Sequence, residues 1–381
     1  MQTGTIYFKE YEWQGLHELP FSNEAAQVLL VFAERTILER DNIFGFLKTS
    51  FPNANIIYCS SAGEINNITH LEHAAVCVVM RLEKTPIHFA QDNIHHHNSS
   101  RELGKSISEK LPTENLKYIL VIADGNLVNG DELIDGIQSV ISDEVLITGG
   151  ISGDGDRFEK TLVGLNDDVA TGNVVLMGLY GNHIKVGASF KGGWDVYGPE
   201  RIITKSDGNI LHEIDNENAL DLYKKYLGKY AADLPSSALY FPLTVKSTND
   251  EFYVVRTILS IDEKAKTMKF AGNLPEGATV RFMKSNYDRL VEAASDAGEA
   301  SLYAHEENTS IDLALIVSCV GRKLVLSNRI EEELEAAREF FSESSTVAGF
   351  FSYGEIAPQN SGNRSYLHNQ TITITTFSET V

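Results

Sequence analysis

One structural pattern, a strand followed by a helix and a second strand, occurs three times in the chain and limits its possible folds more than any other feature. The first unit opens with the apolar run at residues 28–33, the second at 118–123 and the third at 313–318. In each unit, apolar residues at helical spacing follow, and then another short apolar run. Such units favour right-handed crossovers and sheets covered by helices. The sequence therefore predicts an α/β fold with α+β features, in which repeated strand-helix-strand units form mixed sheets covered by helices.

Each unit ends its second strand in a glycine-containing turn that carries an acidic residue. Residues 61–65 and 352–356 share the pattern Ser-x-Gly-Glu-Ile, and residues 152–154 read Ser-Gly-Asp. Ligands of open α/β sheets collect beyond the carboxyl ends of strands, and glycine lets a backbone approach a ligand closely. A carboxylate beside free backbone N–H groups suits a small molecule that carries both an ammonium and a carboxylate group. The turn residues expected to bind a ligand are Ser61, Gly63, Glu64, Asp154, Gly354 and Glu355.

Each of these features also has a purely structural interpretation. An acid in a glycine turn can simply cap neighbouring backbone amides. Arg322 follows the strand at 313–318 and could clamp a ligand carboxylate, or it could pair with Glu355 or with a helix carboxylate. His368 opens the last strand near the expected crevice, where it could contact a ligand or serve only as a hydrogen-bonding group at the start of that strand.

The stretch at 236–282 differs from the three units. It contains an alternating segment and short strands interrupted by turn residues, which predicts a mostly antiparallel sheet. No low-complexity linker interrupts the chain, so we expect two tightly joined domains with a boundary near residues 216–228.

The composition argues against several classes of protein. The chain has 32 Lys and Arg against 53 Asp and Glu, a net charge of −21, which disfavours nucleic acids and anionic membrane surfaces as partners. No apolar run approaches the ~20 residues that span a bilayer, and the N-terminus lacks the pattern of a signal peptide. Cys59, Cys77 and Cys319 are widely spaced, which fits a reducing compartment. We therefore expect a cytoplasmic protein that neither binds nucleic acid nor inserts into a membrane.

The search for catalytic and metal-binding motifs in the sequence is negative. The chain has no G-x-S-x-G, H-E-x-x-H or Walker pattern. Cys319 has no histidine near it in sequence that could activate it, and the adjacent residues His95, His96 and His97 would point in different directions. We expect no catalytic residue, no metal and no cofactor. The alternative is an unrecognised enzyme that uses Cys319 or Glu355 as its reactive group.

Taken together, these motifs resemble the FIST family of bacterial and eukaryotic signal-input domains. The resemblance covers about residues 25–375. It rests on residues 51–54, 59–65, 124–125, 149–154, 193–194, 254–256, 319–322, 349–356 and 368–371. It implies a bacterial sensory protein with a FIST N-terminal domain at 25–217 and a FIST C-terminal domain at 218–376.

The resemblance also implies that a small ligand, an amino acid or a related metabolite, binds in a crevice between the two domains. We expect the turn at 61–64 to contact it together with a C-terminal cluster made of Arg322, Tyr353, Gly354, Glu355, His368 and Asn369. Because no kinase or cyclase segment is present, the protein is expected to signal through a separate partner, a histidine kinase or a cyclic-di-nucleotide signalling enzyme. A subgroup of the family resembles haem-based nitric oxide sensors, which gives a second hypothesis, haem bound through a histidine.

Overall fold

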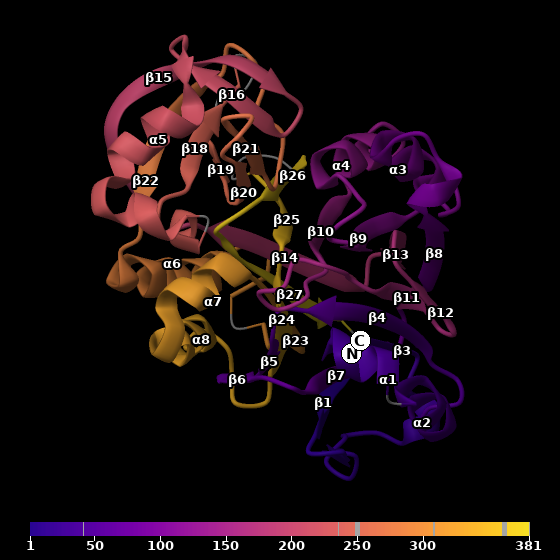
Figure 1. The fold of residues 1–381 in the computed structure, drawn as a ribbon. Coiled ribbons are helices and arrows are strands. Elements are labelled where there is room, and N and C mark those ends of the chain that lie inside the picture. Colours follow the sequence, from indigo (N-terminus) through magenta and orange to yellow (C-terminus); the bar gives the residue numbers. More distant parts are fainter. Residues whose placement is uncertain (41, 235, 248–251, 308, 360–363, 381) are drawn as a thin grey trace.

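The computed structural model describes residues 1–40, 42–234, 236–247, 252–307, 309–359 and 364–380. Three sheets form the main body of the molecule, and each is built around a parallel strand pair from one of the predicted units (Figure 1). The pairs are β3 (Val28–Glu34) with β4 (Asn55–Ser61), β9 (Leu116–Ala123) with β10 (Leu146–Ile151), and β23 (Leu313–Cys319) with β24 (Thr346–Ser352). The predicted α/β fold with mixed sheets is thus confirmed.

Antiparallel strands complete the three sheets. The first sheet has the order β12-β11-β4-β3-β7-β1-β2, the second β26-β25-β10-β9-β13-β8, and the third β14-β27-β23-β24-β5-β6. The added strands are β1 Gln2–Lys9, β2 Glu12–Gln14, β5 Glu64–Asn66, β6 Thr69–Leu71, β7 Ala75–Arg81, β8 Ile87–Asn93, β11 Val163–Leu165, β12 Asp168–Ala170, β13 Asn173–Tyr180, β14 Ile184–Lys191, β25 Gly354–Pro358, β26 Ser365–His368 and β27 Ile372–Glu379. Inner strands such as β13 are apolar and buried along their whole length because both faces of their sheet are covered.

Helices cover the outer faces of the sheets. The α-helices of the body are α1 Arg35–Arg40, α2 Ile43–Ser50, α3 Ser100–Ser108, α4 Gly130–Gln138, α6 Tyr287–Ala300, α7 Val320–Leu326 and α8 Ile330–Arg338, with short 3-10 turns η1 Asn23–Ala25, η2 Ile94–His96 and η5 Ser327–Arg329. The side chain of Asn129 caps α4 by accepting a hydrogen bond from the Glu132 amide at 3.2 Å. Within the described residues, no helix has the length and apolar character needed to cross a membrane.

The inner faces of the three sheets enclose a common hydrophobic core. Phe32 of the first sheet stacks on Phe350 of the third with a ring distance of 4.7 Å. Tyr118 of the second sheet packs edge-on against Phe377 of the third at 5.1 Å. Since every sheet contributes to this core, the three units form one body.

The three units also exchange strands in a closed cycle. After its acidic turn the first unit sends β5 to the sheet of the third, where Glu64 pairs with Phe350. The third unit sends β25 to the second sheet, and the second unit sends β11 to the first. This cyclic pattern brings the ends of β4, β10 and β24 together.

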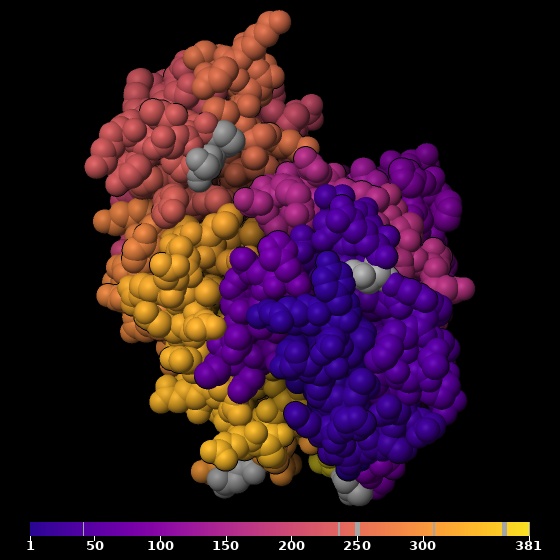
Figure 2. Space-filling view, turned by 60° about the horizontal axis from the view of Figure 1, so that its bottom comes forward, coloured from indigo at the N-terminus to yellow at the C-terminus, as the bar shows by residue number. Residues whose placement is uncertain are grey.

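An antiparallel lobe lies between β14 and α6 in the sequence and protrudes from the body (Figure 1, Figure 2). Its elements are β15 Asp195–Asp207, β16 Ile210–Ile214, β17 Glu217–Asn218, α5 Ala219–Leu227, η3 Gly228–Asp233, η4 Ser236–Tyr240, β18 Leu243–Lys246, β19 Val254–Arg256, β20 Ile258–Asp262, β21 Thr267–Phe270 and β22 Thr279–Lys284. A separate core lies between this sheet and α5. The expected antiparallel sheet therefore begins earlier, at Asp195, and residues 217–218, where we expect the domain boundary, form β17 of this lobe.

Candidate ligand-binding site

The three turns predicted from the sequence meet in space. Backbone hydrogen bonds connect the turns to one another. In each bond, the N–H of the residue that follows the serine of one turn donates to the carbonyl of the residue that precedes the serine of another turn. These hydrogen bonds run from Ala62 to Phe351 at 2.8 Å, from Gly153 to Ser60 at 2.9 Å and from Tyr353 to Ile151 at 3.0 Å. The convergence expected of the glycine-acid turns is therefore present at the centre of the body.

Two of the converging turns are closed by a serine-glutamate hydrogen bond. Ser61 donates to Glu64 at 2.5 Å, and Ser352 donates to Glu355 at 2.5 Å. Both glutamates are completely buried. Burial raises the pKa of each carboxyl to about 8, against the hydrogen bonds that favour ionisation. These acids are therefore mostly protonated at neutral pH, and their side chains hold the turns rather than face solvent.

Asp154, in the second turn, is occupied by two arginines. It accepts hydrogen bonds from Arg35 at 2.9 Å and from Arg157 at 2.7 Å. Burial opposes its ionisation, but the hydrogen bonds from Arg157 and Arg35 outweigh that effect, so the pKa of Asp154 lies below its usual value. The carboxylate is thus committed to the protein's own cations.

Arg322 forms an ion pair inside the structure. Its guanidinium is completely buried and donates to Glu333 of α8 at 2.6 Å. The same group donates to the backbone carbonyls of Leu290, at 2.8 Å, and of Gly192. The geometry matches the structural alternative, a pair with a helix carboxylate, and leaves Arg322 away from both cavities described below.

The remaining residues predicted to bind a ligand make contacts within the protein. Gly63 has a φ of 133°, a backbone conformation that residues with a Cβ rarely adopt, so the turn favours glycine at this position. Asn369 is buried and donates to the Tyr353 carbonyl at 3.5 Å. His368 stacks on Phe190 with a ring distance of 3.9 Å and faces the Ala357 carbonyl at 3.2 Å. Burial lowers the pKa of His368 to about 3, which keeps the ring neutral.

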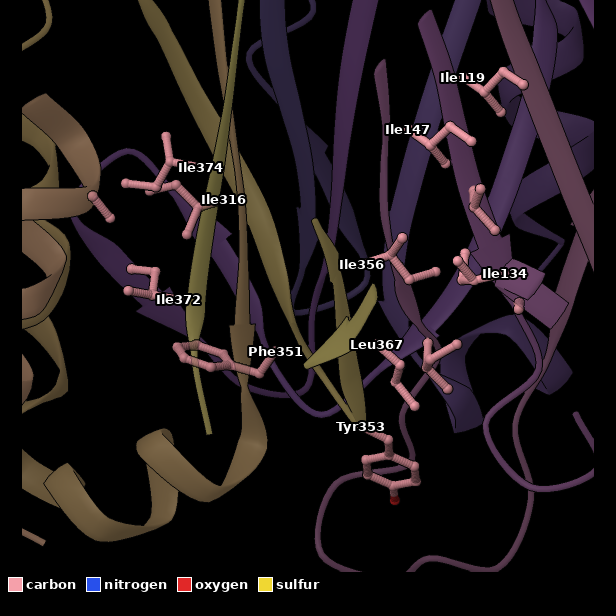
Figure 3. Close-up of a cluster of buried hydrophobic side chains, with 14 of the residues drawn as sticks. Ile119, Ile134, Ile147, Ile316, Phe351, Tyr353, Ile356, Leu367, Ile372 and Ile374 are labelled. Atoms are coloured by element: carbon pink, nitrogen blue, oxygen red, sulfur yellow. The ribbon is translucent and has the colours of Figure 1, made fainter. Parts of the chain in front are cut away.

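A large cavity of about 1130 Å³ lies between the lobe and the body. Tyr353 forms part of its wall, at the edge of the buried cluster shown in Figure 3, with its hydroxyl directed away from that cluster. This hydroxyl accepts a hydrogen bond from the Phe158 amide and donates one to the Gly155 carbonyl, both at 3.2 Å. Six aromatic side chains contribute to the wall: Phe158, Tyr230, Tyr240, Phe241, Tyr287 and Tyr353.

Charged residues of both signs also line the large cavity. Asp156 and Lys284 are exposed, and neither forms an ion pair with another described residue. The hydroxyl of Thr257 is buried in the wall and has no hydrogen-bond partner among the described residues. Burial, and then the nearby Glu355 carboxyl, raise the pKa of the Cys319 thiol far above its ordinary value. The cavity thus offers a ligand the Asp156 carboxylate, the Lys284 ammonium and the unpaired Thr257 hydroxyl, and the acidic residue Asp233 also lines it.

A second, small cavity of about 280 Å³ is lined by His368. The other residues predicted to bind a ligand, apart from Tyr353, are described in the structure but line neither the large nor the small cavity. They form the frame that positions Tyr353 and His368. Sequence reasoning missed Asp156, Thr257 and Lys284, which belong to no motif; the tyrosines at 223–240 were the signal available for the aromatic wall.

Known proteins share this sequence pattern. The FIST N domain model matches residues 27–217, and the FIST C domain model matches residues 219–358. An uncharacterised protein of Methanocaldococcus jannaschii, MJ1623, is 22% identical over 341 residues, which cover 82% of this chain and 64% of that protein. A crystal structure of a cyanuric acid hydrolase from A. caulinodans has a TM-score of 0.42 and 8% identity over 100% of this chain and 99% of that one. With most of its residues matched by the two domain models, the chain belongs to the FIST family.

Proposed function

We propose that this chain, as a FIST sensor of signal transduction, binds an amino acid or a related zwitterionic metabolite in the large cavity. The observation that carries this proposal is the presence of Asp156 and Lys284, two opposite charges without ion-pair partners among the described residues, in one aromatic-walled cavity. A carboxylate attracts an ammonium group, and an ammonium attracts a carboxylate. Aromatic walls favour the apolar part of a ligand, and the Thr257 hydroxyl gains a partner when a polar ligand is present.

Signalling in this proposal follows from the position of the cavity. Its wall combines body residues such as Tyr353 with lobe residues such as Tyr240 and Lys284. A ligand that contacts both parts stabilises the arrangement in which they lie close together, by the difference in its affinity for the two arrangements. The partner that reads this change is, in our proposal, a separate histidine kinase or cyclic-di-nucleotide enzyme in the cytoplasm.

The side chains near the cavities favour a binding protein over an enzyme. A general base must be ionised and must reach the ligand, but Glu64 and Glu355 are buried, have a pKa of about 8 and line neither cavity. Cys319 does line the large cavity, but its raised pKa favours the unreactive thiol over the thiolate. We therefore propose a binding protein and not an enzyme.

The residues fit the haem hypothesis poorly. No histidine is among the described residues that line the large cavity. His368 lines the small cavity, but its Nε2 lies 3.2 Å from the Ala357 carbonyl, which is a hydrogen-bond distance. No haem step is therefore included in the proposal.

The direct test is a thermal-shift screen with the common amino acids, followed by calorimetric titration of the best ligand. The ligand's N-acetyl derivative lacks the ammonium charge, and its amide lacks the carboxylate. The wild-type protein is expected to bind each derivative about tenfold or more weakly, because one charge-assisted contact is lost. Asp156→Asn should bind the amino acid and its N-acetyl derivative alike, and Lys284→Gln should no longer distinguish acid from amide.

The matched variants make the result specific. Asp143→Asn and Lys269→Gln remove the same charges from exposed positions outside the large cavity and should retain full discrimination. The proposal is wrong if no amino acid or related metabolite binds, or if Asp156→Asn and Lys284→Gln discriminate as well as the wild-type protein.

A further inference from the structure

The small cavity carries a second, independent inference because it differs chemically from the large one. It lies between the lobe and the third sheet, with apolar walls formed by Phe190, Tyr253, Val254, Val255 and Met283. Its volume of about 280 Å³ is close to the lower end of the ~300–1,000 Å³ range of small-molecule sites. The cavity therefore suits a compact ligand with an apolar part.

Arg281 is the one charged group that lines this cavity among the described residues. It lies on β22, where Val280 and Phe282 point into the lobe core while Arg281 and Met283 face the cavity. Its Nε is buried and has no hydrogen-bond partner among the described residues, and its Nη2 makes a long hydrogen bond of 3.5 Å to the Gly198 carbonyl. It forms no ion pair with a described residue, although the chain carries 53 acidic residues.

The absence of an ion-pair partner for Arg281 within the described part of the chain is informative. A guanidinium that is partly removed from water without a counter-ion is unfavourable, and its planar fork matches a carboxylate in a bidentate arrangement. The described lining contains no carboxylate, and it includes the hydroxyl-bearing residues Thr244 and Thr371. Because the His368 ring is neutral, Arg281 is the one cation among the described residues that line the cavity.

We propose that the small cavity is a second binding site, specific for a small monocarboxylate with an apolar body, in which Arg281 holds the carboxylate. The walls around Phe190 and Met283 contact the apolar part of the ligand. The Thr244 hydroxyl at the cavity is placed to donate to a carboxylate oxygen of the ligand, whereas the Thr371 hydroxyl donates to Glu355. This site shares no lining residue with the large cavity.

The test uses the full chain and three pairs of probes: acetate, butyrate and phenylacetate, each with its neutral amide. Ligand-observed NMR titration gives the dissociation constant of each. Phenylacetate is expected to bind at least about tenfold more tightly than phenylacetamide, because the amide cannot form the charge-assisted contact with Arg281. Inorganic phosphate, which lacks an apolar body, should bind more weakly than phenylacetate.

Substitutions of Arg281 and of an exposed lysine show whether the carboxylate binds at Arg281. Arg281→Gln should remove the preference for the acid while retaining phenylacetamide binding, which shows that the cavity is intact. Arg281→Lys should retain part of the preference, and the exposed Lys269→Gln should retain all of it.

Three results would overturn the proposal. The first is a wild-type protein that binds acid and amide alike, or neither. The second is an unchanged preference in Arg281→Gln. The third is a preference lost in Lys284→Gln but kept in Arg281→Gln, which would place the carboxylate in the large cavity.

Discussion

At the scale of single residues, Glu355 connects the walls of the two cavities. Its carboxyl accepts hydrogen bonds from Ser352, which precedes Tyr353 of the large cavity, and at 2.8 Å from Thr371 of the small cavity. Because the carboxyl is completely buried, its protonation is tied to the integrity of the fold. Glu64 occupies the corresponding position in the first unit.

This burial predicts a pH dependence of stability. The pKa of Glu355 is about 8 in the folded protein and close to 4.5 when the chain unfolds. Between these values the folded state holds the proton and the unfolded state does not, so the stabilisation present below pH 4.5 is lost as the pH rises towards 8. The wild-type protein loses this stabilisation and Glu355→Gln does not. The unfolding free energy of Glu355→Gln minus that of the wild-type protein should therefore rise by on the order of 2–4 kcal/mol from pH 5 to pH 8.

Denaturant unfolding at several pH values measures this difference. The matched control is Glu331→Gln, on the exposed face of α8, which should follow the wild-type profile. Parallel profiles of Glu355→Gln and the wild-type protein would show that the buried carboxyl does not titrate as described.

At the scale of elements, Arg322 joins several helices at one point. From α7 it reaches Glu333 of α8 and the Leu290 carbonyl of α6, while Ser318 of β23 donates to the same glutamate at 3.2 Å. Removing one member of a buried ion pair leaves the other charge without compensation.

Arg322→Met is therefore expected to destabilise the protein by about 3–5 kcal/mol. The double variant Arg322→Met with Glu333→Met should recover much of that loss, because no unpaired charge remains. Urea unfolding measures both effects, and the folded fraction of Arg322→Met should keep the wild-type affinity for a ligand of the large cavity. A loss below about 1 kcal/mol, or a selective loss of ligand affinity, would contradict the structural role.

The elements themselves were predictable where the signal is local. The apolar runs of β3, β9 and β23 depend on neighbouring residues, and the sequence predicts them correctly. The partner of Arg322 was left open, because Glu333 comes from a helix whose orientation the sequence does not reveal. The residues of the large cavity, such as Asp156 and Lys284, come from separate segments and have no common local pattern.

At the scale of the whole molecule, the cyclic exchange of β5, β11 and β25 makes the three units depend on one another. The lobe has its own core and contacts the body across the two cavities. The sequence predicts the repeated units and the convergence of their turns. It does not predict that the turns form a packed frame while the open space lies between that frame and the lobe, because this depends on side chains far apart in the chain.

Hydrogen exchange measured by mass spectrometry, with and without the best amino-acid ligand of the thermal-shift screen, tests most directly whether the large cavity is the sensor site. Ligand should slow exchange both in the body, at residues 153–160 and 319–326, and in the lobe, at residues 236–241, because these segments form the cavity wall. Slowed exchange confined to the other side of the body, for example at β1 and β2, or no change in either wall segment, would contradict the account.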